Sequence, residues 1–381
     1  MTALAILCDY REEVWPSMDL CAEAIVRGLA AAPGLGLTPV QVLPPFRRRF
    51  GVLPGGRASA LRNADRLLNR MWDYPRHARR MAPSCELFHV ADHSYAHLVL
   101  ALPAARTGVY CHDLDTFRCL LAPQLEPRPA WFRAMARHIL TGLQQAAIVF
   151  YGTEAVRAQI EQAGLVRPER LVHAPLGIDP ELTRATAAAQ LPPAVRRPFL
   201  LHVGSCIARK RVDLAIDALA AARARRPDLL LVQVGGTFTA AHRAQLARLG
   251  LADAAVQLRG LATAALGELY RQTELVLQPS DAEGFGLPVA EALACGAPVL
   301  ASDIPALREV AGGAALFAPA GDGRAFAQLA VEVVSGRISP PPRDRRLAQG
   351  SRFSWEAHVR TIAAAYLGLA DGAPAPRAVV A

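Results

Sequence analysis

The sequence predicts an α/β protein made of two doubly wound, Rossmann-like domains. Short apolar runs alternate with helical patterns along the whole chain, which is typical of parallel sheets whose strands are connected by helices. The length of 381 residues exceeds what one hydrophobic core usually organises. A polar and proline-rich break at residues 178–198 separates two such alternating series. We therefore expect two domains, with ligands bound in a cleft between them, beyond the carboxyl ends of the strands.

The first series predicts a domain at residues 1–180. Its apolar runs indicate strands at 4–8, 40–43, 87–90, 107–111, 148–151 and 171–174, with a helix at 20–31. After an expected linker at 181–195, the second series predicts a domain at 196–370. Its expected strands are 199–203, 229–234, 256–259, 275–278, 298–301 and 315–317, and its expected helices are 212–225, 240–249, 289–295, 323–334 and 355–369. The last helix is long enough to cross back to the first domain, and residues 371–381 are expected to form a disordered tail.

The composition is that of a globular protein. Because 52% of the residues are hydrophobic and 20% are charged, disordered and fibrous classes are excluded. No apolar run reaches the roughly 18 residues that a membrane span needs. The opening MTALAILCDY lacks a basic leader and a cleavage site and is expected to form the first strand. The seven cysteines are scattered and never spaced C-x-x-C, which argues against disulfides and structural zinc and favours a cytoplasmic protein.

The net charge of +9 is concentrated in one segment. Residues 44–80 contain ten arginines and two aspartates, a net charge of +8. Arg62, Arg66 and Arg70 recur every fourth residue and are expected on one helix face, with the apolar Leu61, Ala64, Leu68 and Met71 on another. Such a helix suits an anionic membrane surface or an anionic acceptor, and equally a solvated helix packed on its own domain. With few exposed aromatic residues and no recognisable nucleic-acid module, the chain is not expected to bind nucleic acid.

A single lysine marks the start of the second domain. Of the 42 basic residues only Lys210 is not an arginine, and it follows Arg209 in HVGSCIARKR, directly after an expected strand. Arginine binds phosphate in a bidentate manner and lysine binds it as a point charge. We therefore expect this pair to bind two adjacent phosphates and to stabilise a departing diphosphate without a metal ion.

A second loop carries the acidic residues. In QPSDAEGFGLPVAE, a strand is expected to end at Gln278, glycines to open the loop, and Pro288 to begin a helix. The positive end of that helix would face the loop and favour an anion such as a diphosphate. Glu283 on the loop and Glu291 on the helix could accept hydrogen bonds from sugar and ribose hydroxyls.

Together these segments resemble family 4 of the retaining glycosyltransferases, which have the two-domain GT-B fold. The resemblance extends over nearly the whole chain and is strongest from Phe199 to Phe317. The E-x(7)-E pattern matches Glu283 and Glu291 in EGFGLPVAEALACGAPVLASD, and the phosphate-binding pair matches VGSCIARKRVD. The mid-domain strand matches as LVQVGG, and FSWEAHV resembles the closing helix. The combination is specific, whereas E-x(7)-E alone would be a weak signal.

The resemblance implies a role for each matched residue. Glu291 would bind the nucleotide ribose and Glu283 the donor sugar, while Arg209 and Lys210 would stabilise the leaving group. Further donor contacts would come from Gly204, Phe285, Gly286 and Leu287, and the base would lie near Arg259, Gly260 and Leu261. In the first domain, YCHDLD places His112 near the donor sugar and the reacting carbon, with Asp113, Trp15 and His93 on the acceptor side.

Two features depart from the family pattern. The loop after the first strand reads DYREEVWPSMD, without the glycines that members often carry there, and Ser205 stands where many have an arginine. The acceptor is therefore not predictable from the commoner members. Asp113 and Asp115 form a D-x-D, which we interpret as part of the His-Asp pair rather than as a metal motif. We likewise expect His89, Asp92, His93 and His97 to form the strand-end wall of the acceptor cleft rather than a metal site.

The resemblance implies a retaining enzyme that transfers a hexose from a nucleoside diphosphate sugar to a hydroxyl of a polysaccharide or polyprenyl-linked glycan. Mannose is favoured, because VGS-x-x-x-RK-x-VD is similar to mannosyltransferases that use GDP-mannose. The nucleotide sugar is a co-substrate, and no cofactor or metal is expected. A UDP-sugar epimerase and a non-catalytic nucleotide-sugar-binding protein remain as alternatives. A dinucleotide-dependent oxidoreductase is disfavoured, because no G-x-G-x-x-G follows the first strand of either domain. We expect a cytoplasmic protein that could associate peripherally with the inner face of a membrane.

Overall fold

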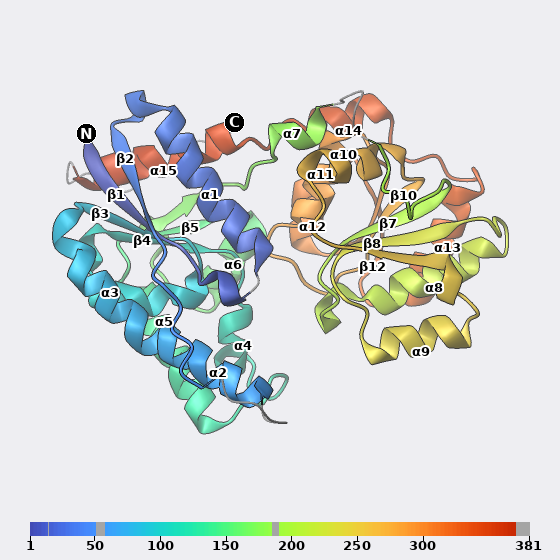
Figure 1. Ribbon diagram of the computed structural model, residues 1–381. Helices are drawn as coiled ribbons and strands as arrows, with labels where there is room; N and C mark the ends of the chain where they lie inside the picture. Colours follow the sequence, from blue (N-terminus) through green and yellow to red (C-terminus); the bar gives the residue numbers. More distant parts are fainter. Residues whose placement is uncertain (14, 51–57, 185–189, 371–381) are drawn as a thin grey trace. The chain divides into compact units, whose positions relative to one another are not determined.

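The computed structural model describes residues 1–13, 15–50, 58–184 and 190–370 (Figure 1). The chain divides into two compact units. The N-terminal unit comprises residues 1–176 together with the last helix, α15 (Trp355–Ala370), and the C-terminal unit comprises residues 177–354. Each unit is built around its own six-stranded parallel sheet. The predicted class, α/β with two doubly wound sheets, is confirmed.

The sheet of the N-terminal unit has the strand order β2-β1-β3-β4-β5-β6. Its strands are β1 (Thr2–Leu7), β2 (Leu37–Val42), β3 (Leu87–Val90), β4 (Thr107–Cys111), β5 (Ile148–Tyr151) and β6 (Leu171–His173). Its other α-helices are α1 (Pro16–Ala31), α2 (Ala58–Leu68), α3 (Tyr74–Met81), α4 (Arg118–Leu121), α5 (Ala130–Gln145) and α6 (Glu154–Gln162). The chain places β2 on one side of β1 and β3 on the other side, so the order of the strands reverses at β1. The topological switch point therefore lies between β1 and β3. In doubly wound sheets, ligands bind at such a point.

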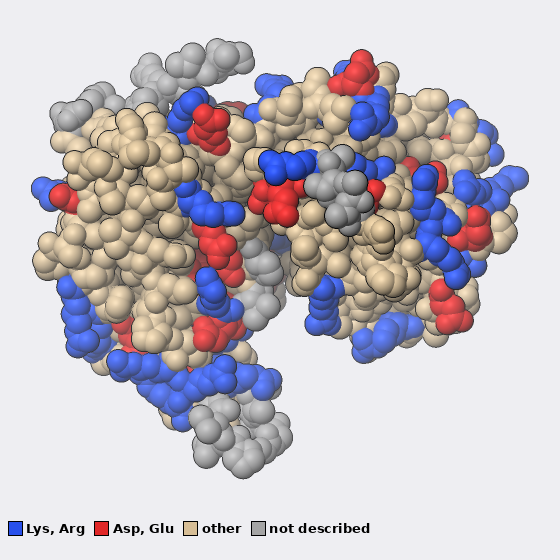
Figure 2. All heavy atoms as spheres, turned by 45° about the horizontal axis from the view of Figure 1, so that its top comes forward, with Lys and Arg blue, Asp and Glu red and all other residues tan. Residues whose placement is uncertain are grey.

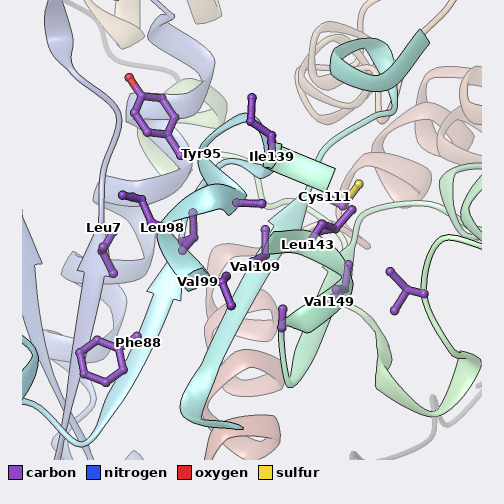
Figure 3. Packing of buried hydrophobic residues seen from close by; sticks show 14 of the residues in the cluster. Leu7, Phe88, Tyr95, Leu98, Val99, Val109, Cys111, Ile139, Leu143 and Val149 are labelled. Atoms are coloured by element: carbon purple, nitrogen blue, oxygen red, sulfur yellow. The ribbon is translucent and has the colours of Figure 1, made fainter. Parts of the chain in front are cut away.

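The core of the N-terminal unit lies between the sheet, α5 and a 3₁₀ helix, η5 (His93–Ala101). Figure 3 shows apolar side chains from neighbouring strands, among them Leu7, Phe88 and Val109, converging beneath these two helices. All three side chains are at most 1% exposed. At Gly142 on α5, an added Cβ would lie 2.0 Å from the Ala96 carbonyl oxygen, so a glycine is required for this close approach. The polar residues at the carboxyl ends of the strands are thus held on a rigid base.

Helix α15 belongs to the N-terminal unit, although the expected second domain extended to residue 370. It packs against α1, and the Tyr366 hydroxyl donates to the Phe88 carbonyl oxygen at 2.8 Å. His89 Nδ1 lies 3.0 Å from the same hydroxyl, so this buried histidine is part of the core and not of a strand-end wall. The chain therefore crosses back after residue 354. The expected tail at 371–381 lies outside the described residues.

The sheet of the C-terminal unit has the order β12-β11-β10-β7-β8-β9. Its strands are β7 (Phe199–Gly204), β8 (Leu230–Gly235), β9 (Ala255–Leu258), β10 (Leu275–Gln278), β11 (Val299–Asp303) and β12 (Leu316–Pro319). The helices are α7 (Pro180–Thr183), α8 (Val212–Arg223), α9 (Ala240–Arg248), α10 (Thr263–Gln272), α11 (Leu287–Ala294), α12 (Pro305–Ala311), α13 (Gly323–Val334) and α14 (Arg343–Gly350). The switch point of this sheet lies between β7 and β10.

The expected linker at 181–195 begins inside a packed element. Leu182 on α7 is 2% exposed, and its carbonyl oxygen accepts hydrogen bonds from Arg271 at 2.9 Å and Cys295 at 3.5 Å. These contacts attach the start of the segment to the C-terminal unit, while residues 185–189 lie outside the described part. Among the described helices, none combines the length and the apolar character needed to cross a membrane.

Candidate functional site

Polar side chains gather at the switch point of the C-terminal sheet, where β7 and β10 end. After β7 the chain runs through Gly204 into a short 3₁₀ helix, Ala208–Lys210, and then into α8. After β10 a loop leads through Glu283 to α11. The two loops are joined directly, because the Asp281 amide donates to the Arg209 carbonyl oxygen at 2.8 Å. The structure thus brings together the basic pair and the first glutamate of the sequence motif.

Glu283 is held by four donors. Its Oε1 accepts hydrogen bonds from Lys210 Nζ at 2.6 Å, from Gln278 Nε2 at 2.7 Å and from Ser280 Oγ at 2.7 Å. Its Oε2 lies 3.5 Å from Arg209 Nη1, which also donates to a backbone carbonyl. The side chains of Glu283 and Lys210 are 6% and 12% exposed. Lys210 therefore sits beside Glu283, and the lone lysine is part of a built ionic cluster.

Charge keeps Glu283 ionised in this cluster. Burial alone would raise the pKa of Glu283, but the Lys210 ammonium and the Arg209 guanidinium outweigh burial and hold the pKa below its usual value. An ionised carboxylate with this many donors is a weak base and a weak nucleophile, because proton transfer or bond formation would break its hydrogen bonds. The arrangement suits positioning and electrostatic stabilisation.

The backbone after Glu283 requires glycine at one position. Gly286 has φ +92°, in the left-handed region, and an added Cβ would lie 2.4 Å from Leu307 Cδ2. Leu287 begins α11, with Pro288 in its first turn, and the ring of Phe285 packs edge-on against Phe353 at 5.3 Å. The predicted donor contacts Phe285, Gly286 and Leu287 thus lie together where the positive end of α11 meets the loop.

Glu291 lies on α11 and has a different environment from Glu283. Its Oε2 accepts a hydrogen bond from the Tyr270 hydroxyl at 2.8 Å. Burial raises the pKa of Glu291 to about 7. The hydrogen bond from Tyr270 lowers this pKa, and the negative charge of Asp179 raises it. Of the two glutamates of E-x(7)-E, Glu283 therefore has a lowered pKa and Glu291 a raised one.

The remaining predicted donor residues lie at the carboxyl ends of β7 and β9. Gly204 ends β7 with φ +148°, and an added Cβ would lie 3.8 Å from Lys210 Cε. Arg259 and Gly260 follow β9 and are exposed, and Leu261 is partly exposed. The Arg259 guanidinium donates to Thr237 Oγ1. These residues share one edge of the parallel sheet with the Glu283 cluster.

A second polar group lies in the N-terminal unit. His93 Nδ1 is 3.1 Å from Asp92 Oδ1, and its Nε2 is 3.4 Å from Asp113 Oδ1. Burial alone would lower the pKa of His93, but Asp113 and Asp92 outweigh it and raise the pKa to about 10. His112 Nε2 lies 2.9 Å from the Ala91 carbonyl oxygen, and burial lowers its pKa. His93 thus lies between two carboxylates that raise its pKa, beside a His112 whose pKa burial lowers.

One expectation for the histidines of the N-terminal unit needs correction. His97 is buried, with Nε2 2.9 Å from the Arg70 carbonyl oxygen, so it belongs to the interior like His89 and not to a wall. Trp15 precedes α1 and is 44% exposed. The Asp115 amide donates to Asp113 Oδ1 at 3.0 Å, so the D-x-D forms a turn. Among the described residues, no group of three or more His, Cys, Asp or Glu side chains is arranged to hold a metal ion.

Several residues of the site were not expected from the sequence. Gln278 ends β10 and Ser280 lies between it and Glu283, and these positions could have indicated both residues. Tyr270 lies on α10, a helix that was not expected. His202 on β7 is fully buried, both of its ring nitrogens lack a hydrogen-bond partner in the described structure, and burial beside Lys210 lowers its pKa to about 4.

The chain is similar in sequence to known glycosyltransferases. Residues 197–335 match the family described as glycosyl transferases group 1. The D-inositol 3-phosphate glycosyltransferase of Segniliparus rotundus is 30% identical over 60% of this chain and 54% of that protein. The O-antigen chain mannosyltransferase B of Escherichia coli is 26% identical over 64% of this chain and 66% of that protein. The chain thus spans about half to two thirds of the length of these relatives.

Solved structures show the same fold. The sucrose-phosphate synthase of Thermosynechococcus elongatus covers 98% of this chain and 100% of its own length, with a TM-score of 0.73 and 19% identity. Anabaena Alr3699/HepE, in complex with UDP and glucose, covers 95% of this chain and 98% of its own, with a TM-score of 0.71 and 19% identity. At such identities the likeness concerns the fold alone. The chain therefore has the GT-B fold, and its residues 197–335 match the group 1 glycosyltransferases.

Proposed function

We propose that the chain is a retaining hexosyltransferase that uses a nucleoside diphosphate sugar, with GDP-mannose favoured, and glycosylates a hydroxyl of a glycan or lipid-linked glycan. The observation that carries this proposal is the Lys210–Glu283–Arg209 cluster at the switch point of the C-terminal sheet. The relatives named above differ in acceptor, one acting on an inositol phosphate and one on an O-antigen chain, so they support the transfer but not one acceptor.

In this proposal each residue of the site has a defined role. Lys210 and Arg209 stabilise the charge that develops on the departing diphosphate, since fixed donors cost no reorganisation during the reaction. Glu283 positions Lys210 and accepts a hydrogen bond from the donor sugar, and Glu291 accepts hydrogen bonds from the ribose. His112, neutral because burial lowers its pKa, binds a hydroxyl of the donor sugar.

The three hydrogen bonds that Glu283 Oε1 accepts support retention by front-face attack. This carboxylate acts neither as a nucleophile nor as a base in the proposed reaction. The leaving phosphate would therefore take the proton of the acceptor hydroxyl. The nucleotide–sugar bond breaks as the acceptor oxygen forms its bond to the same face of the sugar carbon. The products are the glycoside and the nucleoside diphosphate.

Turnover tests the function. With GDP-mannose and membrane glycan extracts, we expect release of GDP that depends on the acceptor, and less release from UDP-glucose. Proton NMR of the product should show the anomeric configuration of the donor. Thermal-shift measurements with GDP and UDP should show stabilisation by the preferred nucleotide, because a ligand of the folded state stabilises it by mass action. Turnover of the donor without an acceptor to an epimerised sugar would favour the epimerase, and binding without turnover would favour the non-catalytic protein.

We also propose that helices α2 and α3 contact an anionic membrane surface. Figure 2 shows basic side chains gathered along the lower edge of the N-terminal unit, where these helices lie. Arg62, Arg79 and Arg80 are exposed. Leu67, Leu68 and Trp72 are 40%, 37% and 57% exposed, so apolar side chains accompany the charges, as in helices that lie on membranes.

The packing of this segment differs from the expected amphipathic pattern. The polar residues Asp65 and Asn69 are buried on the inner side of this segment. Their side chains accept hydrogen bonds from the backbone amides of residues 47, 49 and 50. Arg66 and Arg70 turn toward Glu13, at 3.9 and 3.7 Å. Leu68 is therefore directed outward rather than into a core. Arg57 lies outside the described residues.

Sedimentation with vesicles tests the membrane contact. We expect the protein to bind vesicles of phosphatidylglycerol and phosphatidylcholine at low salt and to be released at high salt. Replacing Arg62, Arg79 and Arg80 with glutamine should weaken binding by on the order of a hundred-fold, at about 1 kcal/mol per arginine. A control with Arg225, Arg248 and Arg324 replaced has the same net charge and should bind as the wild type does. Equal binding to pure phosphatidylcholine would contradict the proposal.

A further inference from the structure

Three polar side chains form a row across the sheet of the C-terminal unit. His202 on β7, Gln233 on β8 and Gln257 on β9 are paired in register on three neighbouring strands (Figure 1). His202 and Gln233 are fully buried, and Gln257 is partly exposed. Strands of parallel sheets are normally apolar runs, because helices cover both faces of the sheet. The row is therefore a departure from the usual composition of such a sheet.

The row lies directly before the loops of the candidate donor site. Two residues further along the three strands stand Gly204, Gly235 and Arg259. Gly204 starts the loop that leads to Lys210, and Arg259 is the residue predicted to lie near the base. The polar row thus lies at the base of both donor loops.

Gln233 holds the end of β7. Its Nε2 donates to the Gly204 carbonyl oxygen at 2.7 Å. A Cβ added to Gly204 would lie 3.8 Å from Lys210 Cε, so the lysine side chain passes beside this glycine. At its far end the same loop is fixed by the hydrogen bond from the Asp281 amide to the Arg209 carbonyl oxygen. The bond from Gln233 therefore fixes the backbone beside which the lysine is positioned.

Gln257 extends this arrangement to the next loop. Its Nε2 lies 2.9 Å from Gln233 Oε1 and 3.0 Å from the Gly236 carbonyl oxygen, and it donates to both. The residue after this glycine, Thr237, accepts a hydrogen bond from the Arg259 guanidinium. Gln257 therefore holds the loop on which the predicted base-binding arginine rests.

The two loops also pack on each other. A Cβ added to Gly236 would lie 2.5 Å from Cys206 Sγ and 2.6 Å from the Cys206 amide nitrogen, so this close approach requires glycine. A chain of side-chain hydrogen bonds runs beneath the contact, from Gln257 through Gln233 to the carbonyl oxygen of Gly204. Buried amides chained in this way strengthen one another and rigidify their surroundings.

We propose that Gln233 and Gln257 are positioning residues for the donor. Gln233 places the loop that carries Lys210 against the departing diphosphate, and Gln257 places the loop at 236–237 against the nucleoside. Both act through backbone carbonyl oxygens rather than by touching the donor. The proposal rests on the glycosyltransferase function proposed above and adds two residues to its donor site. Because the lysine acts on the transition state and the nucleoside contacts act on binding, the two glutamines should affect different kinetic quantities.

Steady-state kinetics with GDP-mannose and calorimetric titration with GDP test this division. Gln233→Met keeps the length of the side chain but removes its hydrogen bonds. It should lower kcat by about ten- to a hundred-fold, as small misplacements of a catalytic group do, and leave the Kd of GDP within about three-fold of the wild type. Gln257→Met should instead weaken GDP binding by about ten-fold, with kcat within about three-fold. Because Gln257 is partly exposed, its variant tests the proposal even if Gln233→Met does not fold.

A matched glutamine separates positioning from a merely structural role. Gln349 on α14 donates to the Val310 carbonyl oxygen at 2.8 Å, and Gln349→Met should change neither kcat nor the affinity for GDP. A merely structural role would lower the folded fraction and reduce both quantities without dividing them between the two variants. If the wild type neither binds nor turns over GDP- or UDP-sugars, the proposed function fails. If the wild type turns over but the variants match Gln349→Met, or lose both quantities together, only the positioning proposal is overturned.

Discussion

Replacing Lys210 with methionine should reduce turnover by about a hundred- to a thousand-fold, because it removes a fixed cation from the developing charge of the leaving group. The KM for the donor should change much less than kcat, since the diphosphate gains most of its charge in the transition state. The substitution should also destabilise the C-terminal unit. Glu283 would remain buried without its ammonium partner, and breaking a buried pair in this way costs about 3–5 kcal/mol.

A double substitution separates the two effects. In Lys210→Met with Glu283→Gln, no buried charge is left alone, so the stability to urea should recover while turnover stays low. Arg226→Met is a matched control, because it removes a basic group with an exposed partner at 3.6 Å and should alter neither property. Full turnover by Lys210→Met would exclude the lysine from catalysis and, with it, the proposed role of the cluster.

The strands of both sheets were predictable because most are apolar runs bounded by polar residues, and the central ones are buried on both faces. β3, β4, β5 and β10 have the predicted bounds, and the other strands differ by one to three residues at an end. The position of α15 was harder to predict, since its apolar face would suit either unit. Its packing against α1 and the contacts of Tyr366 with β3 assign it to the N-terminal unit.

The site was predictable where charge and spacing coincide. Glu283, Arg209 and Lys210 lie on loops after neighbouring strands, so sheet topology alone brings them together. The outward position of Leu68 was not predictable, because hydrogen bonds from the backbone amides of residues 47, 49 and 50 direct polar residues of this helix inward.

Nucleoside binding should strengthen as the pH rises through about 7, the pKa of Glu291 in the free protein. An ionised carboxylate accepts hydrogen bonds from ribose hydroxyls more strongly than a protonated one. Binding would therefore require loss of a proton below this pH, so the affinity should fall by up to about ten-fold per pH unit. Titration with guanosine avoids the ionisation of a terminal phosphate, which falls in the same pH range.

The same shift has a consequence for stability. Because the folded state binds the Glu291 proton more tightly than the unfolded state does, this group stabilises the fold at low pH, and its contribution is lost as the pH rises from about 4.5 to about 7. Glu291→Gln should remove both this slope and the pH dependence of guanosine binding, and should weaken binding at pH 8 by about ten- to a hundred-fold.

Tyr270→Phe provides the matched variant for Glu291. The Tyr270 hydroxyl donates to Glu291 Oε2 at 2.8 Å and stabilises its ionised form, so its removal should raise the pKa of Glu291 further. The midpoint of the guanosine titration should then move to higher pH while the affinity at the alkaline plateau stays near that of the wild type. A midpoint unaltered in Tyr270→Phe, or a pH dependence that persists in Glu291→Gln, would assign the titration to another group and remove Glu291 from the ribose site.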